Sequence, residues 1–300
     1  MKVIRARRLG YCMGVRRAVR LAYAEAEKNA GRVYTAGPLI HNPQVLEDLR
    51  RRGVEVLDDT PGRLPELSGA VVIIRAHGIT PRLETELSSR AAVIVDATCP
   101  KVKASQTKAR DLSEAGYRIF LAGEKLHGEV IGIQGYAPDC IIVANPEEAQ
   151  EAGRMVASGG NKDPDKAPLK TALMGQTTIS PEEYRAIAQA ITAYLPRTEI
   201  INTLCPATKE RQDALRALSR EADALIIAGG RESANTRRLL AIAQAEGRSC
   251  DKPAWLVESP EELPPGLAAY GAIGLSAGAS TPDEVIDAIE RAINSNSKFK

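Results

Sequence analysis

The chain has 300 residues, of which 44% are hydrophobic, and a formal net charge of +2 at pH 7. This composition can build packed cores, but the small charge and the scarcity of Phe and Trp argue against a nucleic-acid-binding protein. No apolar run approaches the roughly 18 residues that cross a bilayer, and no signal-peptide core follows Met1. We therefore expect a cytoplasmic protein that binds no membrane, and a small anionic substrate is compatible with its charge.

Three cysteines stand in the same sequence context. Each of Cys12, Cys99 and Cys205 follows a β-rich run and opens an amphipathic helix. The three helices are predicted over residues 14–28, 101–115 and 207–222. A thiol at a helix start lies near the positive end of the helix macrodipole, which favours its thiolate form. The five cysteines of the chain contain no C-x-x-C pair, so neither a disulfide framework nor a zinc ribbon is expected.

Each of these helices is followed by an apolar strand and a polar turn. The strands are predicted over residues 32–36, 117–122 and 224–228. The polar residues of the turns are His41, His127 and Ser233, which stand 29, 28 and 28 positions after the preceding cysteine. A nearly constant spacing in three segments indicates internal repetition.

A second strand of each repeat leads through a small polar turn into another helix. These strands begin near Val71, Ala172 and Ala272, and the helices after them are preceded by Thr80, Ser180 and Thr281, each followed by proline. Serine and threonine are good N-caps, and proline suits the first helical position. Strands that alternate with helices predict an α/β fold with parallel sheets.

The repeats predict three similar α/β lobes. We place them at residues 13–98, 99–203 and 204–300, and we expect the N-terminal strand within residues 1–12 to pair with the sheet of the last lobe. Ligands of open α/β sheets bind beyond the carboxyl ends of the strands. Each lobe can therefore direct one cysteine and two polar turns at a common centre.

Three convergent thiolates fit an iron–sulfur cluster in which one iron lacks a protein ligand, because a cubane cluster normally takes four cysteines. An open coordination position is typical of a catalytic metal site. Such an iron could polarise a substrate oxygen as a Lewis acid while the cluster delivers electrons. Cys140 and Cys250 lie outside the repeat pattern, and we interpret them as ordinary buried residues.

The three histidines of the chain all fall on these turns, at His41, His77 and His127. Imidazole can carry charge near neutral pH, and hydroxyl and amide groups can complete an anion site with it. Ser233, Asn235 and Ser280 supply such neutral donors in the last lobe. The turns therefore predict a phosphate or diphosphate site.

One carboxylate breaks the symmetry of the repeat. Two residues beyond His41, His127 and Ser233 stand Pro43, Glu129 and Asn235, so only the middle lobe has an acid at this place. An ionisable group that faces a metal and a phosphate site is a candidate proton donor. We predict Glu129 as the general acid and the nearby Thr177 as a relay or positioning hydroxyl. Thr178 is the alternative, because neighbouring residues of a strand point to opposite faces.

The motifs that carry these residues resemble one enzyme family. In chain order they are G-Y-C-M-G-V-R-R-A, G-P-L-I-H-N, A-H-G, D-A-T-C-P-K-V, H-G-E, Q-T-T-I-S, N-T-L-C-P-A-T, S-A-N-T and S-A-G-A-S-T-P. Over essentially the whole chain, they resemble the 4-hydroxy-3-methylbut-2-enyl diphosphate reductase (LytB) family. This is a family of iron–sulfur oxidoreductases that catalyse the last step of the non-mevalonate isoprenoid pathway.

The resemblance implies a pseudo-threefold α/β trefoil around a central [4Fe–4S] cluster, held by Cys12, Cys99 and Cys205, with one open iron site. It implies that the substrate hydroxyl binds this iron and leaves as water when two electrons and protons arrive. The products would be isopentenyl and dimethylallyl diphosphate. The electron donor would be of the ferredoxin or flavodoxin type, because the chain lacks a nicotinamide or flavin fingerprint.

The resemblance also implies roles for individual residues. The residues that match diphosphate-binding positions are His41, His77, Ser233, Asn235 and Ser280. The residues that match positions at the reacting end of the substrate are His127, Glu129 and Thr177, with Glu129 delivering protons. The chain departs from many members at Ala234, where they carry a second serine, so one phosphate hydroxyl is missing.

Two alternative functions compete with the reductase. A zinc-dependent hydrolase of a phosphorylated substrate would keep its activity in air and lose it to chelators, but ligands from three distant lobes lack the usual zinc spacing. An iron–sulfur sensor or binding module would retain its cluster and ligand affinity when Glu129 is replaced by Gln, whereas an enzyme would lose turnover.

Overall fold

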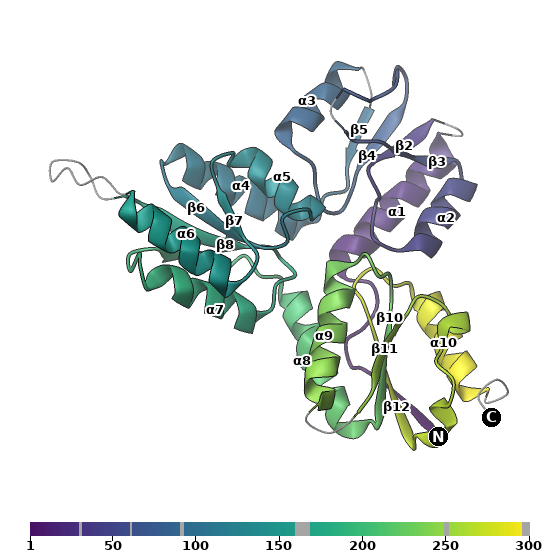
Figure 1. The fold of residues 1–300 in the computed structure, drawn as a ribbon. Coiled ribbons are helices and arrows are strands. Elements are labelled where there is room, and N and C mark those ends of the chain that lie inside the picture. Colours follow the sequence, from purple (N-terminus) through teal and green to yellow (C-terminus); the bar gives the residue numbers. More distant parts are fainter. Residues whose placement is uncertain (30–31, 61, 91–92, 160–168, 249–251, 296–300) are drawn as a thin grey trace. The chain divides into compact units, whose positions relative to one another are not determined.

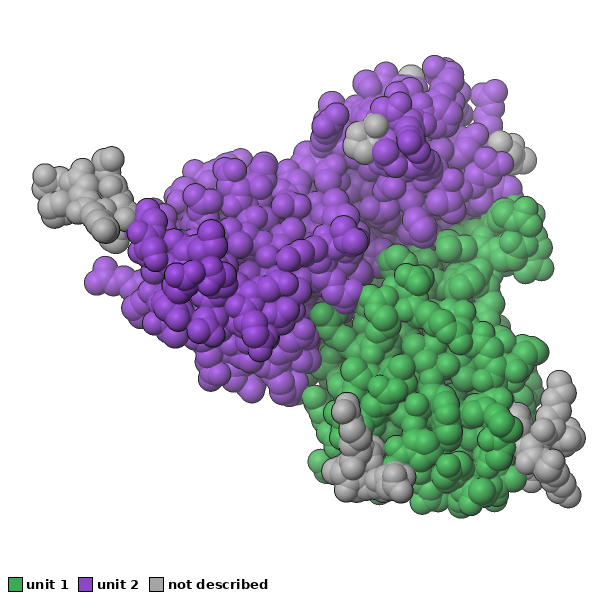
Figure 2. Space-filling view, viewed as in Figure 1, with its two compact units in different colours: residues 1–19, 40–51, 206–300 green, residues 20–39, 52–205 purple. Residues whose placement is uncertain are grey.

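A computed structural model of residues 1–300 describes the chain except residues 30–31, 61, 91–92, 160–168, 249–251 and 296–300 (Figure 1). The chain forms two compact units, shown in Figure 2. One unit comprises residues 1–19, 40–51 and 206–300, and the other comprises residues 20–39 and 52–205.

Within the described residues, the strands form three four-stranded sheets in which all neighbours run parallel. The first sheet has the order β3-β2-β4-β5. Its strands are β2 (Val33–Ala36), β3 (Val54–Leu57), β4 (Val71–Ile74) and β5 (Val93–Asp96). The middle sheet repeats this order as β7-β6-β8-β9. Its strands are β6 (Arg118–Ala122), β7 (Ile141–Val143), β8 (Thr171–Gly175) and β9 (Glu199–Ile200).

The last sheet has the same order, but its fourth strand comes from the start of the chain. The order is β11-β10-β12-β1, and β1 pairs with β12 in a register that sets Lys2 opposite Ala272. The strands are β1 (Lys2–Arg5), β10 (Ala224–Ala228), β11 (Ala254–Val257) and β12 (Ala272–Ala277). The N-terminal strand therefore joins the sheet of the last third of the chain and takes the place that β5 and β9 take in theirs.

Helices connect the strands, as parallel pairing requires. The helices are α1 (Met13–Lys28), α2 (Pro43–Arg51), α3 (Pro81–Ser89), α4 (Pro100–Glu114), α5 (Gly128–Tyr136), α6 (Pro146–Ser158), α7 (Pro181–Thr192), α8 (Pro206–Glu221), α9 (Ala234–Arg248) and α10 (Asp283–Asn294), with 3₁₀ turns at Pro260–Glu262 and Leu267–Ala269. The three predicted cysteine helices are confirmed as α1, α4 and α8. The prediction of an α/β fold with three similar parallel sheets is also confirmed.

The middle sheet shows how the cores are built. Phe120 and Leu173 point to the face that packs against α7, where Ile187 is fully buried. The neighbouring residues Ile119 and Leu121 point to the opposite face, which α4 and α5 cover (Figure 1). A strand that is buried on both faces reads as a continuous apolar run, and this is why β6, β8, β10 and β12 stand out in the sequence.

One predicted helix cap is wrong. Thr80 and Ser180 cap α3 and α7 as expected, each accepting a backbone N–H from the first turn of its helix. In α10, Pro282 occupies the N-cap position instead of Thr281. Thr281 is fully buried, and its Oγ1 donates a hydrogen bond to the carbonyl oxygen of Ala228 at 3.0 Å. The end of β10 therefore holds this hydroxyl away from the helix.

Across the described residues, no helix combines the length and the apolar character that a bilayer-spanning segment needs.

Candidate active site

The turns before Cys99 and Cys205 have the same local structure. The side chain of Asp96 accepts the backbone N–H of Thr98 at 2.8 Å, and the side chain of Asn202 accepts the backbone N–H of Leu204 at 3.3 Å. Both are Asx turns, and each delivers its cysteine to the start of the next helix. The recurring D-x-x-C and N-x-x-C spacing could have revealed them in the sequence.

Asp96 also anchors the start of α4. Its carboxylate lies 3.2 Å from the ammonium of Lys103. Partial burial acts to raise the pKa of Asp96, but the hydrogen bonds from Thr98 and the charge of Lys103 outweigh it, so the pKa lies below its usual value. This carboxylate therefore stays ionised at neutral pH and keeps the Asx turn closed.

The turn that carries Cys12 is held differently. Gly10 has a φ of 72°, which favours glycine, and its carbonyl oxygen accepts a 2.6 Å hydrogen bond from the guanidinium of the buried Arg211. The Sγ of Cys12 accepts the backbone N–H of Val15 at 3.5 Å. The thiol thus lies at the open N–H groups of α1, as the sequence predicted.

The backbone N–H of each of the three cysteines donates to a carbonyl oxygen on the turn after a strand. These strands are β4, β8 and β12, and in each case the acceptor is the second residue after the strand. The three acceptors are the carbonyl oxygens of Ala76, Thr177 and Ala279, at 3.0, 3.0 and 3.2 Å from the nitrogens of Cys99, Cys205 and Cys12 respectively. All three cysteines are half-buried, and among the cysteines that the structure describes none forms a disulfide. The fold therefore fixes each cysteine backbone against one of the polar turns that the repeat predicts.

Glu129 is buried, with 1% of its surface exposed, and both of its carboxylate oxygens bind Thr177. The backbone N–H of Thr177 donates to Oε1 at 2.6 Å, and its hydroxyl donates to Oε2 at 2.8 Å. The hydroxyl of Thr178 instead accepts from the amide of Gln176 at 3.0 Å. The structure therefore brings Glu129 together with Thr177, and the hydroxyl of Thr178 together with Gln176.

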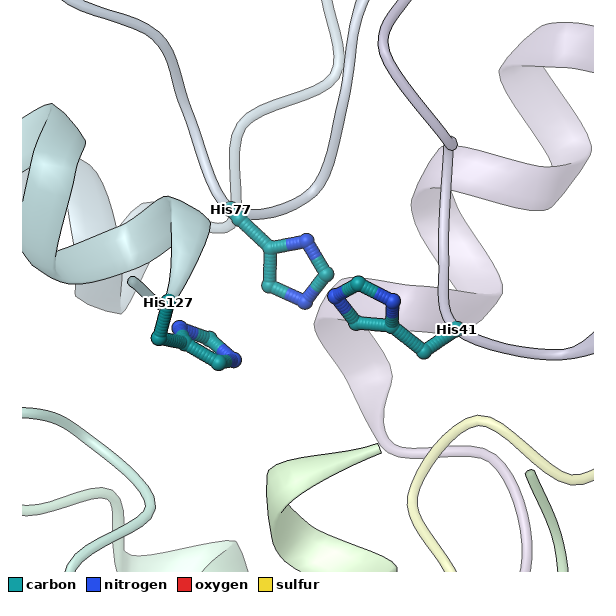
Figure 3. Close-up of side chains that lie close together, drawn as sticks. All are labelled: His41, His77 and His127. Carbon is teal, nitrogen blue, oxygen red and sulfur yellow. The ribbon is translucent and has the colours of Figure 1, made fainter. Parts of the chain in front are cut away.

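His127 is the N-cap of α5. Its Nδ1 accepts the backbone N–H of Glu129 at 3.2 Å, so a neutral His127 carries its proton on Nε2. The ring of His77 lies edge-on to the ring of His127, with 5.2 Å between the centroids (Figure 3). In this unit, two predicted histidines thus meet beside the predicted acid.

The other compact unit holds a second group of predicted residues. The hydroxyl of Ser280 donates to the carbonyl oxygen of His41 at 3.1 Å. The same carbonyl passes so close to Gly230 that a Cβ there would lie only 2.5 Å from it. Ser233 accepts the backbone N–H of Thr236 at 3.4 Å, at the start of α9. These contacts place the turn of His41 on the carboxyl ends of β10 and β12.

Asn235 lies in the first turn of α9 and is 5% exposed. Its Nδ2 has no hydrogen-bond partner among the described residues. A buried amide without an acceptor costs free energy, so this position suits an anionic ligand. The neighbouring Ala234 is also buried, and its methyl side chain offers no donor.

Cys140 differs from the three repeated cysteines. It is half-buried rather than fully buried as expected, it packs against a hydrophobic cluster of the middle sheet, and this partial burial raises the pKa of its thiol to about 11. A thiol of this kind is poorly suited to metal binding at neutral pH. Cys250 lies outside the described residues.

Comparisons with known proteins agree on one family. The family model described as LytB protein matches residues 3–294. A 4-hydroxy-3-methylbut-2-enyl diphosphate reductase from Treponema denticola is 44% identical over 299 residues, which cover 98% of this chain and 99% of the relative.

Two solved structures are also similar to the chain. One is an (E)-4-hydroxy-3-methyl-but-2-enyl diphosphate reductase described as the terminal enzyme of the non-mevalonate pathway. It has a TM-score of 0.67 and 36% identity, and the match covers 98% of this chain and 100% of that one. The other is the E-1-hydroxy-2-methyl-but-2-enyl-4-diphosphate reductase of Plasmodium falciparum, with a TM-score of 0.85, 27% identity, and coverage of 99% and 89%. The chain therefore belongs to the LytB family of 4-hydroxy-3-methylbut-2-enyl diphosphate reductases.

Proposed function

We propose that this chain is itself a 4-hydroxy-3-methylbut-2-enyl diphosphate reductase. It removes the hydroxyl group of the allylic diphosphate by two-electron reduction and releases isopentenyl and dimethylallyl diphosphate. The hydrogen bonds that connect Glu129, Thr177 and Cys205 support this proposal most directly. The buried carboxylate of Glu129 is held by Thr177, and the carbonyl of Thr177 accepts the backbone N–H of Cys205. A candidate proton donor is thereby linked through one residue to a candidate metal ligand.

The donor set fits an iron–sulfur cluster. Cys12, Cys99 and Cys205 are half-buried thiols outside any disulfide, and each lies at the start of a helix. A thiolate is the form that binds iron. We infer that these three residues hold a [4Fe–4S] cluster with one iron open to the substrate, at the centre of three lobes with the bounds 13–98, 99–203 and 204–300. When bound, this cluster would supply electrons and a Lewis-acidic iron, with a ferredoxin or a flavodoxin as the donor.

The polar turns would bind the diphosphate. His41, His77 and Ser280 lie on turns at the carboxyl ends of strands, and the Nδ2 of Asn235, which has no partner within the described part of the chain, needs an acceptor. Ser233 adds a hydroxyl at the start of α9. Imidazolium, hydroxyl and amide donors together match the oxygens of a diphosphate.

Glu129 would supply the proton for the departing hydroxyl. Thr177 holds the carboxyl group in one orientation through two hydrogen bonds, and burial excludes water from it. The Nε2–H of His127 offers a second donor on the same helix start, because its Nδ1 is occupied by the N–H of Glu129. A positioned acid of this kind contributes about 10²–10⁴-fold to a proton-transfer step.

The test is anaerobic purification followed by iron and sulfide analysis and an assay with the allylic diphosphate and a chemical reductant. We expect a coloured protein that forms both products. Serine variants of Cys12, Cys99 and Cys205 should lose iron and turnover, whereas Cys140→Ser is the matched control and should retain both. A colourless, iron-free protein with full activity would refute the proposal.

A further inference from the structure

Arg75 follows β4 in the sequence R-A-H-G and precedes His77 by two residues. Its side chain is only 13% exposed and forms an ion pair with Asp59, in which Nη1 lies 2.6 Å from Oδ2. Its Nε donates to the carbonyl oxygen of Gly78 at 3.3 Å, and the backbone N–H of Gly78 donates back to the carbonyl of Arg75 at 3.0 Å. The side chain thus closes the turn that carries His77.

The same guanidinium lies against two glycines of other turns. At Gly128, a Cβ would lie 3.4, 3.5 and 3.6 Å from Nη2, Nε and Cζ of Arg75, so the planar group lies flat against this residue. At Gly37, where φ is 71°, a Cβ would lie only 1.9 Å from Nη1. Arg75 therefore fills the space that a side chain at Gly37 would need.

Gly128 is the residue between His127 and Glu129. Arg75 is consequently in contact with the start of α5, which presents both of these side chains, while it closes the turn of His77. The rings of His77 and His127 meet edge-on in the same unit (Figure 3). The side chain of Arg75 thus contacts both the turn of His77 and the turn of His127 and Glu129. The relative position of these two turns determines where the two imidazole rings and the carboxylate point.

We propose that Arg75 is a positioning residue that fixes the turn of His77 against the His127-Gly128-Glu129 turn, with Asp59 holding its guanidinium in place. The proposal rests on the proposed reductase function for its kinetic consequence. We do not expect Arg75 to bind phosphate itself, because the carboxylate of Asp59 neutralises its charge and bonds its Nη1. The planar guanidinium bonds Asp59 and Gly78 from two separate nitrogens in a fixed geometry, which the single ammonium nitrogen of lysine reproduces only in part.

The experiment compares cluster-loaded, full-length variants in two assays. Isothermal titration with inorganic pyrophosphate measures anion binding, and steady-state kinetics with the allylic diphosphate measures kcat and KM. Arg75→Met should weaken pyrophosphate binding about 10-fold, because His77 is displaced, and lower kcat about 10–100-fold, because the groups on α5 are misplaced. Arg75→Lys should recover part of both losses.

The matched control is Arg63→Met. Arg63 pairs with Asp58, the neighbour of Asp59, at 3.6 Å, but its side chain is 72% exposed. Its removal should change neither pyrophosphate affinity nor kcat by more than about 2-fold, as is usual for exposed ion pairs.

Asp59→Asn separates positioning from direct binding. If Arg75 is a positioning residue, this variant weakens pyrophosphate binding, because the guanidinium loses its anchor. If Arg75 binds phosphate itself, the released cation strengthens binding, and that result would overturn the proposal. Wild-type values in Arg75→Met would overturn it as well. Pyrophosphate binding without turnover in the wild type would count against the reductase function, while the comparison of affinities would still test Arg75.

Discussion

Replacement of Glu129 by Gln removes the ionisable carboxyl proton of the candidate acid and keeps the size and shape of the side chain. The oxygen of the Gln amide can still accept the backbone N–H of Thr177, which now lies 2.6 Å from Oε1. The amide nitrogen then faces the Thr177 hydroxyl at about the present 2.8 Å, and this hydroxyl can rotate and accept instead of donating. Because both hydrogen bonds to Thr177 have a replacement, the free energy of unfolding should fall by less than about 1 kcal/mol.

The effect on catalysis should be far larger than the effect on stability. A carboxamide delivers no proton near neutral pH, and loss of a positioned acid costs about 10²–10⁴-fold in rate. We expect kcat of Glu129→Gln to fall within this range, while iron content and pyrophosphate affinity stay at wild-type values. The same result would exclude a sensor, whose function needs only the cluster and the ligand.

The assay is anaerobic turnover with iron analysis and calorimetric pyrophosphate titration on the same samples. Glu148→Gln is the matched control, because Glu148 also accepts a backbone N–H, from Ala144 at 3.1 Å, but it pairs with Lys125 at the exposed start of α6. This control should keep full activity. A Glu129→Gln protein with an intact cluster and kcat within tenfold of wild type would refute the role of Glu129 as the proton donor.

Three further outcomes are expected. Because burial raises the pKa of Cys140 to about 11, only about 0.1% of this thiol is ionised at pH 8. The rate of its alkylation, followed by peptide mass spectrometry, should therefore rise about tenfold per pH unit until the pH approaches this pKa. Gly274→Ala should destabilise the fold by about 1–3 kcal/mol in urea denaturation, since the new Cβ would lie 2.9 Å from Cγ of the buried Leu218. Thr281→Val should cost only about 1 kcal/mol in the same assay, because the carbonyl of Ala228 keeps a 2.9 Å hydrogen bond from a backbone N–H.

The buried strands and the cysteine helices could be predicted because each has a strong local signal. β6 and β10 are apolar on both faces, and the helices after Cys99 and Cys205 begin with proline. The polar turns could be predicted as well, because a residue that follows a strand of a parallel sheet lies at the carboxyl end of that strand. This is why the sequence could place Glu129 and the histidines on turns at strand ends.

α5 could not be predicted, because its stability comes from tertiary contacts. It contains three glycines in nine residues, G-E-V-I-G-I-Q-G-Y, and glycine disfavours an isolated helix. A Cβ at Gly135 would lie 2.8 Å from the side chain of Thr80, and one at Gly132 would lie 3.1 Å from the amide of Gln106. The glycines thus permit close packing against α3 and α4, which no local pattern reveals.

The structure also shows contacts at a place where periodicity left two residues open, and it adds residues that no motif marked. Thr177 binds Glu129, while the hydroxyl of Thr178 accepts from Gln176, because the chain turns at the end of β8 and no longer alternates as a strand. Arg75 donates to the carbonyl oxygen of Gly78 on the turn that follows it, and Arg211 donates to the carbonyl oxygen of Gly10, which is distant in sequence. An arginine in a sequence gives no indication of which carbonyl it will reach.

The pairing of β1 with β12 also affects how the protein matures. Lys2 pairs with Ala272, which the ribosome adds 270 residues later. At about 5–20 residues per second, synthesis of this stretch takes roughly 14–54 s. The backbone N–H of Cys12 waits equally long for its acceptor at Ala279. A nascent chain therefore lacks this backbone contact of its first cysteine until synthesis is almost complete, and a cluster held by Cys12, as proposed above, would assemble only after that point.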